Sequence, residues 1–297
     1  MNSNILLRQK SIIPWLAGSI VIGGIAITLY KARRTSRSPV FNGFISPIDL
    51  PIVKIIQETH DTKRFLFKLP ETPGKSGLSL TSMILASGNI NGGKRVIRPY
   101  TPINKIDSDD TIELLIKQMP NGKMSGHFFN LKEGDTMQFR GPVSTYKYQQ
   151  NKFDTVTLLG AGSGITPLYQ LASNVVASPD NMTKIKLLYG NKTINDIPLK
   201  KELDDLQRMH PDKFQVEYFV SETPKNQKME SFHIGNINKT FLKDNIPSAT
   251  ENTQIFVCGP TGFMKAMCGD KKNLLVQGTL SGYLKELGYS KTQVHKF

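Results

Sequence analysis

The pattern of hydrophobic and polar positions divides the chain into three stretches. Residues 11–30 form a nearly continuous apolar run without a charge, and residues 41–150 carry short runs of β-branched and aromatic residues between Gly, Pro, Asn and Asp. From residue 151 onward, strand-like apolar runs alternate with helical patterns. We therefore expect an N-terminal segment at 1–40, followed by two globular domains at 41–150 and 151–297.

The two globular stretches predict different sheets. Short strands between turn residues predict a small antiparallel β-barrel in the first stretch, and strands that alternate with helices predict a parallel sheet in the second. The barrel strands are expected at 51–57, 63–69, 96–101, 111–119 and 136–141. In the second stretch, strands are expected at 154–159, 186–189, 214–220 and 255–257, with helices at 168–177 and 199–209. The expected fold class is α+β, with an antiparallel β-barrel domain followed by an α/β parallel-sheet domain.

The apolar run at about 11–30 is long enough to cross a membrane, because about 20 helical residues span the hydrocarbon core. Trp15 and Tyr30 lie near its ends, where interfacial aromatics are favoured, and basic residues flank it. We predict a transmembrane helix that anchors the chain in membrane lipid. The larger positive charge follows the run, which predicts that the bulk of the chain faces the cytosol. A cleaved secretory signal and a buried helix are alternatives, disfavoured by the length and the charged flanks.

The formal net charge of +14 suits an acidic protein partner, an anionic membrane or nucleic acid. No zinc finger, basic helix or aromatic-rich RNA-binding pattern accompanies it, so we expect no nucleic-acid partner. Cys258 and Cys268 are the only cysteines, which excludes a disulfide framework. No His cluster with metal-ligand spacing accompanies them, so we expect no metal site.

A first candidate binding segment is Arg98-Pro99-Tyr100-Thr101, in the third expected strand. Alternate residues of a strand share a face, so Arg98 and Tyr100 are expected to point the same way. A guanidinium can bind a phosphate through two hydrogen bonds, and a phenol ring can lie along a planar cofactor. The alternative is an ordinary edge strand with a surface arginine.

A second candidate is the turn Gly122-Lys123-Met124-Ser125, before a short helix expected at 126–131. A glycine before a helix start leaves backbone N–H groups free to face an anion, and Ser125 can cap the helix or bind phosphate. A plain turn with a cap fits these residues equally well.

A third candidate is the glycine-rich turn at 160–167, between a strand and a helix. Its glycines permit a tight turn, and the helix start presents N–H groups to a pyrophosphate. Thr166 is the expected N-cap, and Pro167 is the expected first helical residue. The turn is neither G-x-G-x-x-G nor a P-loop, so a tight βα loop is the alternative. Cys258 ends the strand at 255–257 and is expected beside this turn if the two strands are neighbours, although simple packing also explains a cysteine there.

These motifs occur in a fixed order along the chain: Arg98 to Thr101, Gly122 to Ser125, Gly141-Pro142, Gly162 to Pro167, and Cys258-Gly259-Pro260. The arrangement resembles the NADH–cytochrome b5 reductases, members of the ferredoxin–NADP reductase superfamily. The resemblance covers about 51–297, and the stretch 287–297 is similar to the fungal mitochondrial-type branch in particular.

The resemblance implies residue roles. Arg98, with Pro99 beside it, would hold the FAD pyrophosphate, and Tyr100 and Thr101 would lie along the isoalloxazine. Thr101 and Cys258 would flank the hydride transfer, the thiol as a packed neighbour and not as a nucleophile. The segment implied at the FAD phosphates is Gly122, Lys123, Met124 and Ser125. The remaining residues implied at the pyridine dinucleotide are Lys117, Gly162, Ser163, Gly164, Thr166, Pro167, Gly259 and Pro260.

Several positions depart from the family pattern, among them Asn104 in place of Ser or Thr and Thr261-Gly262 in place of Pro-Pro or Pro-Gly. Many members carry a histidine, linked to proton handling near the flavin, upstream of the arginine strand; the matching stretch here ends in Met83. An acidic residue that disfavours NADPH often follows the third strand of the nucleotide domain, and here Ser221 stands there with Glu222 next. The cofactors implied are FAD and NADH, with NADPH less favoured.

The resemblance thus implies a NADH-dependent FAD enzyme that passes electrons singly to cytochrome b5 or another acidic electron acceptor. Two alternatives stay open: the same chemistry with a quinone or an ascorbate-type radical as acceptor, and a membrane-tethered relative without turnover. The anchor fits the mitochondrial outer membrane, with the enzyme facing the cytosol, or the endoplasmic reticulum.

Overall fold

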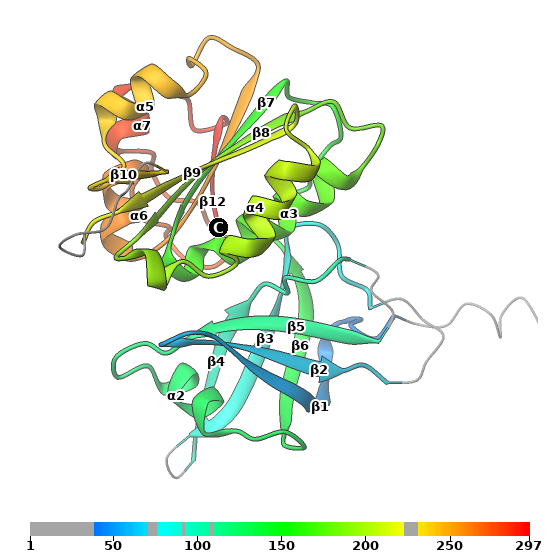
Figure 1. The fold of residues 1–297 in the computed structure, drawn as a ribbon. Coiled ribbons are helices and arrows are strands. Elements are labelled where there is room, and N and C mark those ends of the chain that lie inside the picture. The colour runs from blue at the N-terminus through cyan, green and yellow to red at the C-terminus, as the bar shows by residue number, and fades with distance from the viewer. Residues whose placement is uncertain (1–38, 71–75, 91–92, 107–109, 223–230) are drawn as a thin grey trace, which may run out of the picture. The chain divides into compact units, whose positions relative to one another are not determined.

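The computed structural model describes residues 39–297, except 71–75, 91–92, 107–109 and 223–230. The strands form two six-stranded sheets, an antiparallel one followed along the chain by a parallel one (Figure 1). The transmembrane helix predicted at about 11–30 lies outside the described residues. Among the described residues, no helix combines the length and the apolar character that crossing a membrane requires.

The antiparallel sheet has the strand order β4-β3-β6-β1-β2-β5. Phe65 and Phe67 of β2 are fully buried, and Phe128 of helix α2 meets both rings edge to face. The two phenylalanines share a face because side chains alternate along a strand, and this face forms the core of the first domain. The elements are β1 (Gly43–Thr59), β2 (Thr62–Lys68), β3 (Ser82–Ile90), β4 (Lys94–Tyr100), β5 (Thr111–Lys117), α2 (Lys123–Asn130) and β6 (Thr136–Ser144).

The parallel sheet has the order β10-β9-β8-β7-β11-β12. Helices α3 and α4 pack on one face, and helices α5, α6 and α7 pack on the other (Figure 1). The strands are β7 (Thr155–Ala161), β8 (Lys184–Asn191), β9 (Phe214–Val220), β10 (Phe232–Ile234), β11 (Thr253–Cys258) and β12 (Val294–Lys296). The helices are α3 (Ile165–Ala177), α4 (Lys200–Met209), α5 (Lys239–Asn245), α6 (Thr261–Met267) and α7 (Gly282–Glu286), with short 3-10 turns at Gly162–Gly164 and Ile194–Asp196.

Every strand predicted from the sequence is present, but the prediction missed β3, β10 and β12. β3 contains Ser82, Ser87 and Gly88 and is buried on both faces over most of its length, so it shows no alternation of apolar and polar residues. β10 and β12 have three residues each, which is too short for a periodic signal.

Gln170 of α3 connects the parallel-sheet domain to the antiparallel sheet. Its side chain is 1% exposed, and its Oε1 accepts a hydrogen bond from the Thr81 N–H at 2.8 Å. Its Nε2 donates to the Pro102 carbonyl at 3.0 Å. A buried amide that bonds two backbone groups of the other domain fixes the spacing of the segments on either side of the candidate site.

Candidate active site

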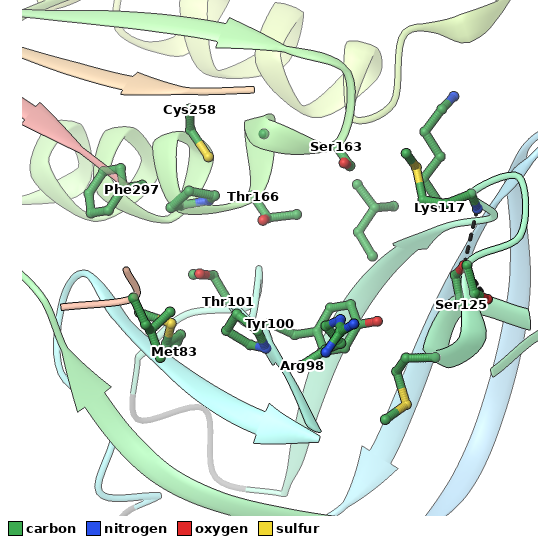
Figure 2. Close-up of a pocket in the computed structure, with 18 of the residues that line it drawn as sticks. Met83, Arg98, Tyr100, Thr101, Lys117, Ser125, Ser163, Thr166, Cys258 and Phe297 are labelled. Carbon is green, nitrogen blue, oxygen red and sulfur yellow. Dashed lines mark hydrogen bonds between the residues drawn. The ribbon is translucent and has the colours of Figure 1, made fainter. Parts of the chain in front are cut away.

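A cavity of about 920 Å³ lies where the end of β4, the start of α2, the glycine-rich turn and the end of β11 meet (Figure 2). Segments from both sheets therefore contribute to one wall. All the site residues predicted from the sequence line this cavity, except Gly162. Gly162 lines a second cavity of about 1410 Å³, which shares Lys117 and Pro260 with the first.

Arg98 and Tyr100 of β4 lie in the middle of this cavity (Figure 2). The Arg98 side chain is exposed, and its Nη1 donates to the Ile97 carbonyl at 2.8 Å. The Tyr100 ring packs edge to face on Phe128, with a centroid distance of 5.3 Å. Burial raises the pKa of Tyr100 to about 12, against the opposing effect of the Arg98 charge, so the phenol is neutral at physiological pH.

The start of α2 differs from the prediction. The helix begins at Lys123 with Gly122 as its N-cap, so the expectation that Ser125 caps the helix is wrong. The Ser125 hydroxyl instead accepts from the Met119 N–H at 3.1 Å and donates to the Gly122 carbonyl at 3.2 Å. A Cβ on Gly122 would lie 2.3 Å from this hydroxyl oxygen, so the turn requires glycine. In the described chain no acceptor is recorded for the N–H groups of Lys123 and Met124, which leaves them available to an anion.

The glycine-rich turn also begins its helix earlier than expected. Residues Gly162–Gly164 form a 3-10 turn and α3 starts at Ile165, so Thr166 is not the N-cap and Pro167 is the third helical residue. The 3-10 turn satisfies the helix start through the backbone, and no side-chain cap is present. The hydroxyl of the fully buried Tyr189 donates to the Gly162 carbonyl at 2.9 Å and so fixes the turn against β8.

Cys258 lies beside this turn because β11 and β7 are parallel neighbours, with Cys258 opposite Gly160. This neighbourhood confirms the expected juxtaposition of the two strand ends. A Cβ on Gly164 would lie 2.3 Å from the Cys258 carbonyl oxygen, so only glycine permits the approach. Burial raises the pKa of the Cys258 thiol to about 12, which keeps it protonated and unreactive at neutral pH.

Lys117 lies at the junction of the two cavities. Its ammonium is 2.6 Å from the Asp61 carboxylate, which lies on the turn between β1 and β2. Burial alone would raise the pKa of Asp61. The hydrogen bonds that its carboxylate accepts from Lys117, Thr62 and Thr59 outweigh burial, so the pKa of Asp61 is lowered. Ser221 and Glu222 line the larger cavity, as Gly162 does.

Sequence reasoning missed several residues of the smaller cavity. Lys271, Asn273 and Leu274 come from a loop after α6, and Phe297 follows the last strand. None of them belongs to a recognisable motif, and only the topology brings them to the wall. Met83 lines the cavity as well (Figure 2), so the described part of the wall carries a thioether and no imidazole.

An antiparallel sheet followed by a parallel α/β sheet, with adjoining cavities at the carboxyl ends of β7 and β11, defines a class of two-domain oxidoreductases that bind a flavin and a pyridine dinucleotide. Two family models match the chain in this order. Residues 49–148 match the oxidoreductase FAD-binding domain, and residues 158–269 match the oxidoreductase NAD-binding domain.

Similar proteins narrow this class. The chain is 45% identical to NADH-cytochrome b5 reductase 2 of Saccharomyces cerevisiae (strain YJM789) over 100% of both chains. It is 45% identical to the Candida glabrata protein of the same name over 96% of each. The fold is similar to the cytochrome b5 reductase domain of Ulva prolifera nitrate reductase, with a TM-score of 0.74, 24% identity, and coverage of 88% of this chain and 100% of that one. The chain belongs to the NADH–cytochrome b5 reductase family.

Proposed function

We propose that this protein transfers a hydride from NADH to FAD and passes the electrons one at a time to cytochrome b5. The observation that carries this proposal is the shared cavity wall, which brings Thr101 from the FAD-binding side and Cys258 from the NAD-binding side to one space (Figure 2). We assign FAD binding to a domain at 41–150 and NADH binding to a domain at 151–297.

The lining of the smaller cavity fits FAD. Arg98 offers a guanidinium to the pyrophosphate, and the free N–H groups at the start of α2 offer further donors. Tyr100, held on Phe128, offers a neutral aromatic face to the isoalloxazine. The FAD-binding residues are Arg98, Pro99, Tyr100, Thr101, Gly122, Lys123, Met124 and Ser125.

The larger cavity and its junction with the smaller one fit the dinucleotide. Lys117, fixed by Asp61, and the glycine-rich turn approach the phosphates, while Cys258 shapes the nicotinamide pocket. Glu222 lines the larger cavity and disfavours an additional phosphate there, which supports NADH over NADPH. The NADH-binding residues are Lys117, Gly162, Ser163, Gly164, Thr166, Pro167, Cys258, Gly259 and Pro260.

The task of the protein is to position the two cofactors, which supply the hydride and electron chemistry when bound. The close approach of Gly164 to Cys258 joins the glycine-rich turn to the end of β11, and Thr101 lines the same cavity, so the two cofactor rings would be held in one space, as hydride transfer requires. The neutral thiol packs against this space without reacting. The net charge of +14 favours an acidic acceptor such as cytochrome b5 and predicts that salt slows electron delivery.

We further propose that residues 11–30 anchor the protein in the mitochondrial outer membrane, facing the cytosol, with the endoplasmic reticulum as the alternative. The uncharged length of this run and its basic flanks support the proposal. Extraction of the full chain from membranes by carbonate at high pH would contradict it.

One spectrum before and after NADH tests the central proposal. The purified full chain is expected to show flavin absorbance that bleaches under anaerobic NADH and returns with oxidised cytochrome b5. A colourless protein that does not take up added FAD would sink the proposal. If the protein reduces a quinone or an ascorbate radical but not cytochrome b5, at the same NADH concentration, the electron acceptor is the alternative one.

A further inference from the structure

The loop between α6 and α7, at 270–279, forms part of the smaller cavity's wall through Lys271, Asn273 and Leu274. Its own hydrogen bonds close it on itself. The Lys272 N–H donates to the Val276 carbonyl at 3.0 Å, and Asn273 Oδ1 accepts from the N–H groups of residues 275 and 276 at 3.0 Å each. These bonds give the loop a defined backbone conformation. The backbone positions of the residues that line the cavity are therefore fixed.

A buried lysine of the last strand holds both ends of this loop. Lys296 is 2% exposed, and its ammonium donates to the carbonyls of Thr279 at 2.8 Å and Asp270 at 3.2 Å. Its backbone N–H and carbonyl bond the side chain of Gln277 at 2.7 and 3.0 Å. A buried ammonium is stable only where its hydrogen bonds are made, so Lys296 ties the loop to β12.

Lys271 differs from Lys117 and Arg95, two other cations that line the cavity. Lys117 pairs with Asp61, and Arg95 bonds Gln138, whereas the half-buried Lys271 has no ion pair or side-chain hydrogen bond to any described residue. No aspartate or glutamate lines this cavity in the part of the chain that the structure describes. Burial lowers the pKa of Lys271, as expected for a cation that lacks a partner.

The groups around Lys271 do not neutralise its charge. The thiol of Cys258 stays protonated because burial raises its pKa to about 12. Burial, with the charge of Lys271, lowers the pKa of His295 to about 4, so that imidazole is neutral at pH 7. The Lys296 ammonium, bonded to the Asp270 carbonyl, adds positive charge, and the Asp270 side chain is exposed. Lys271 and Cys258 line the same cavity and interact electrostatically, so an uncompensated positive charge acts on the Cys258 end of the cavity.

This charge lies at the ring end of the cavity. Cys258, Phe297 and Met83 lie together at one end, whereas Ser125 and Lys117 lie at the other (Figure 2). The proposed phosphate-binding segment starts at Gly122, at the Ser125 end. A cation beside Cys258 is therefore placed to act on the reacting rings and not on the cofactor phosphates.

We propose that Lys271 stabilises the reduced flavin through its positive charge, an inference that rests on the proposed function. When NADH gives up a hydride it becomes NAD⁺, and the flavin that accepts H⁻ gains one unit of negative charge. A fixed cation in a partly desolvated site favours the state with that negative charge, because a preformed charge needs no reorganisation. Met83 carries no charge at this end of the cavity, so we assign the electrostatic stabilisation of the reduced flavin to Lys271.

The test is the midpoint potential of the bound flavin, measured by dye-equilibrated reduction of the FAD-loaded full chain at pH 7 without NADH. Lys271→Gln is expected to lower the equilibrium constant for two-electron reduction about tenfold, which is a midpoint about 30 mV more negative. Lys271→Arg should keep the wild-type value. Lys272→Gln is the matched control, since the exposed Lys272 side chain lies one residue away and does not line the cavity.

Equal potentials for Lys271→Gln and wild type, with FAD fully bound in both, would overturn the inference. An equal shift in Lys272→Gln would also overturn it, because the effect would then be one of net charge. Lys271→Met repeats the measurement if the glutamine variant loses FAD. A wild-type chain that takes up no FAD would instead sink the proposed function, so the two failures are distinguishable.

Discussion

The Glu202 carboxylate of α4 lies 2.6 Å from the guanidinium of Arg64 on β2, so an ion pair joins the nucleotide domain to the antiparallel sheet. Arg64 also pairs with Glu58 and lies 3.4 Å from Glu113. Glu58 in turn accepts a hydrogen bond from the Leu199 N–H at 2.7 Å, at the start of α4. One arginine with three carboxylates thus fastens the two domains on the side of α4, as Gln170 fastens them at α3.

Replacing this arginine should destabilise the protein. Arg64→Ala leaves three partly buried carboxylates without their cation, and the Arg64 side chain is 16% exposed. We expect a loss of unfolding free energy between the about 1 kcal/mol of a surface pair and the about 3–5 kcal/mol of a buried one. Urea unfolding at pH 7 measures it. Lys201→Ala, which removes an exposed pair with Asp205, is the control; an equal loss in both variants would contradict the interpretation.

Gln170→Leu should reduce both stability and FAD affinity. The change leaves the Thr81 N–H and the Pro102 carbonyl unpaired in a buried place, at about 1–3 kcal/mol for each group. Thr81 lines the cavity and Pro102 follows Thr101, so the wall should shift as well. Urea unfolding and a fluorescence titration with FAD measure the two effects. Gln207→Leu, which loses a bond to Val216 inside the nucleotide domain, should lower stability and leave FAD affinity unchanged.

The sequence predicted which residues line the cavity better than it predicted how the helix starts around the cavity are capped. Gly122 and Gly164 stand out because turns and close contacts need glycine, and the structure shows both contacts. The expected capping roles of Ser125 and Thr166 were wrong: neither helix start has a side-chain cap, and at α3 a 3-10 turn precedes the helix. Lys271 could not be found from the sequence, since its position depends on a loop that a buried lysine 25 positions later holds by two carbonyl groups.

The protein should lose stability as the pH falls from about 6.5 to about 4 because of His295. This imidazole is 7% exposed, packs against Tyr146 and Phe256, and has a folded-state pKa lowered to about 4 by burial and by Lys271. In the unfolded chain this imidazole binds a proton near pH 6.5, whereas in the folded chain it stays neutral down to about pH 4. The loss of unfolding free energy is therefore nearly absent at pH 7 and reaches about 2 kcal/mol at pH 5.

The variant His295→Gln cannot titrate in this range. Its unfolding free energy should therefore fall less between pH 7 and pH 5 than that of the wild type, by about 2 kcal/mol. Urea unfolding of both proteins at the two pH values measures the difference, and carboxylates cancel because both proteins share them. Parallel losses in the two proteins would show that His295 is not buried in its neutral form.

Arg98→Ala should weaken FAD binding. Its guanidinium is exposed in the cavity and, among the described residues, bonds only the Ile97 carbonyl, so it can bind a diphosphate at little cost to the fold. Charge-assisted hydrogen bonds contribute about 1.5–3 kcal/mol, which corresponds to a Kd about 10–150 times higher. The Kd of Arg98→Lys for FAD should lie between those of the wild type and Arg98→Ala, because an ammonium keeps the positive charge but cannot form the paired hydrogen bonds of a guanidinium. Arg208→Ala, on the outer face of α4, is the control. An Arg98→Ala protein that stays fully yellow through dilution and gel filtration would show that the pyrophosphate lies elsewhere.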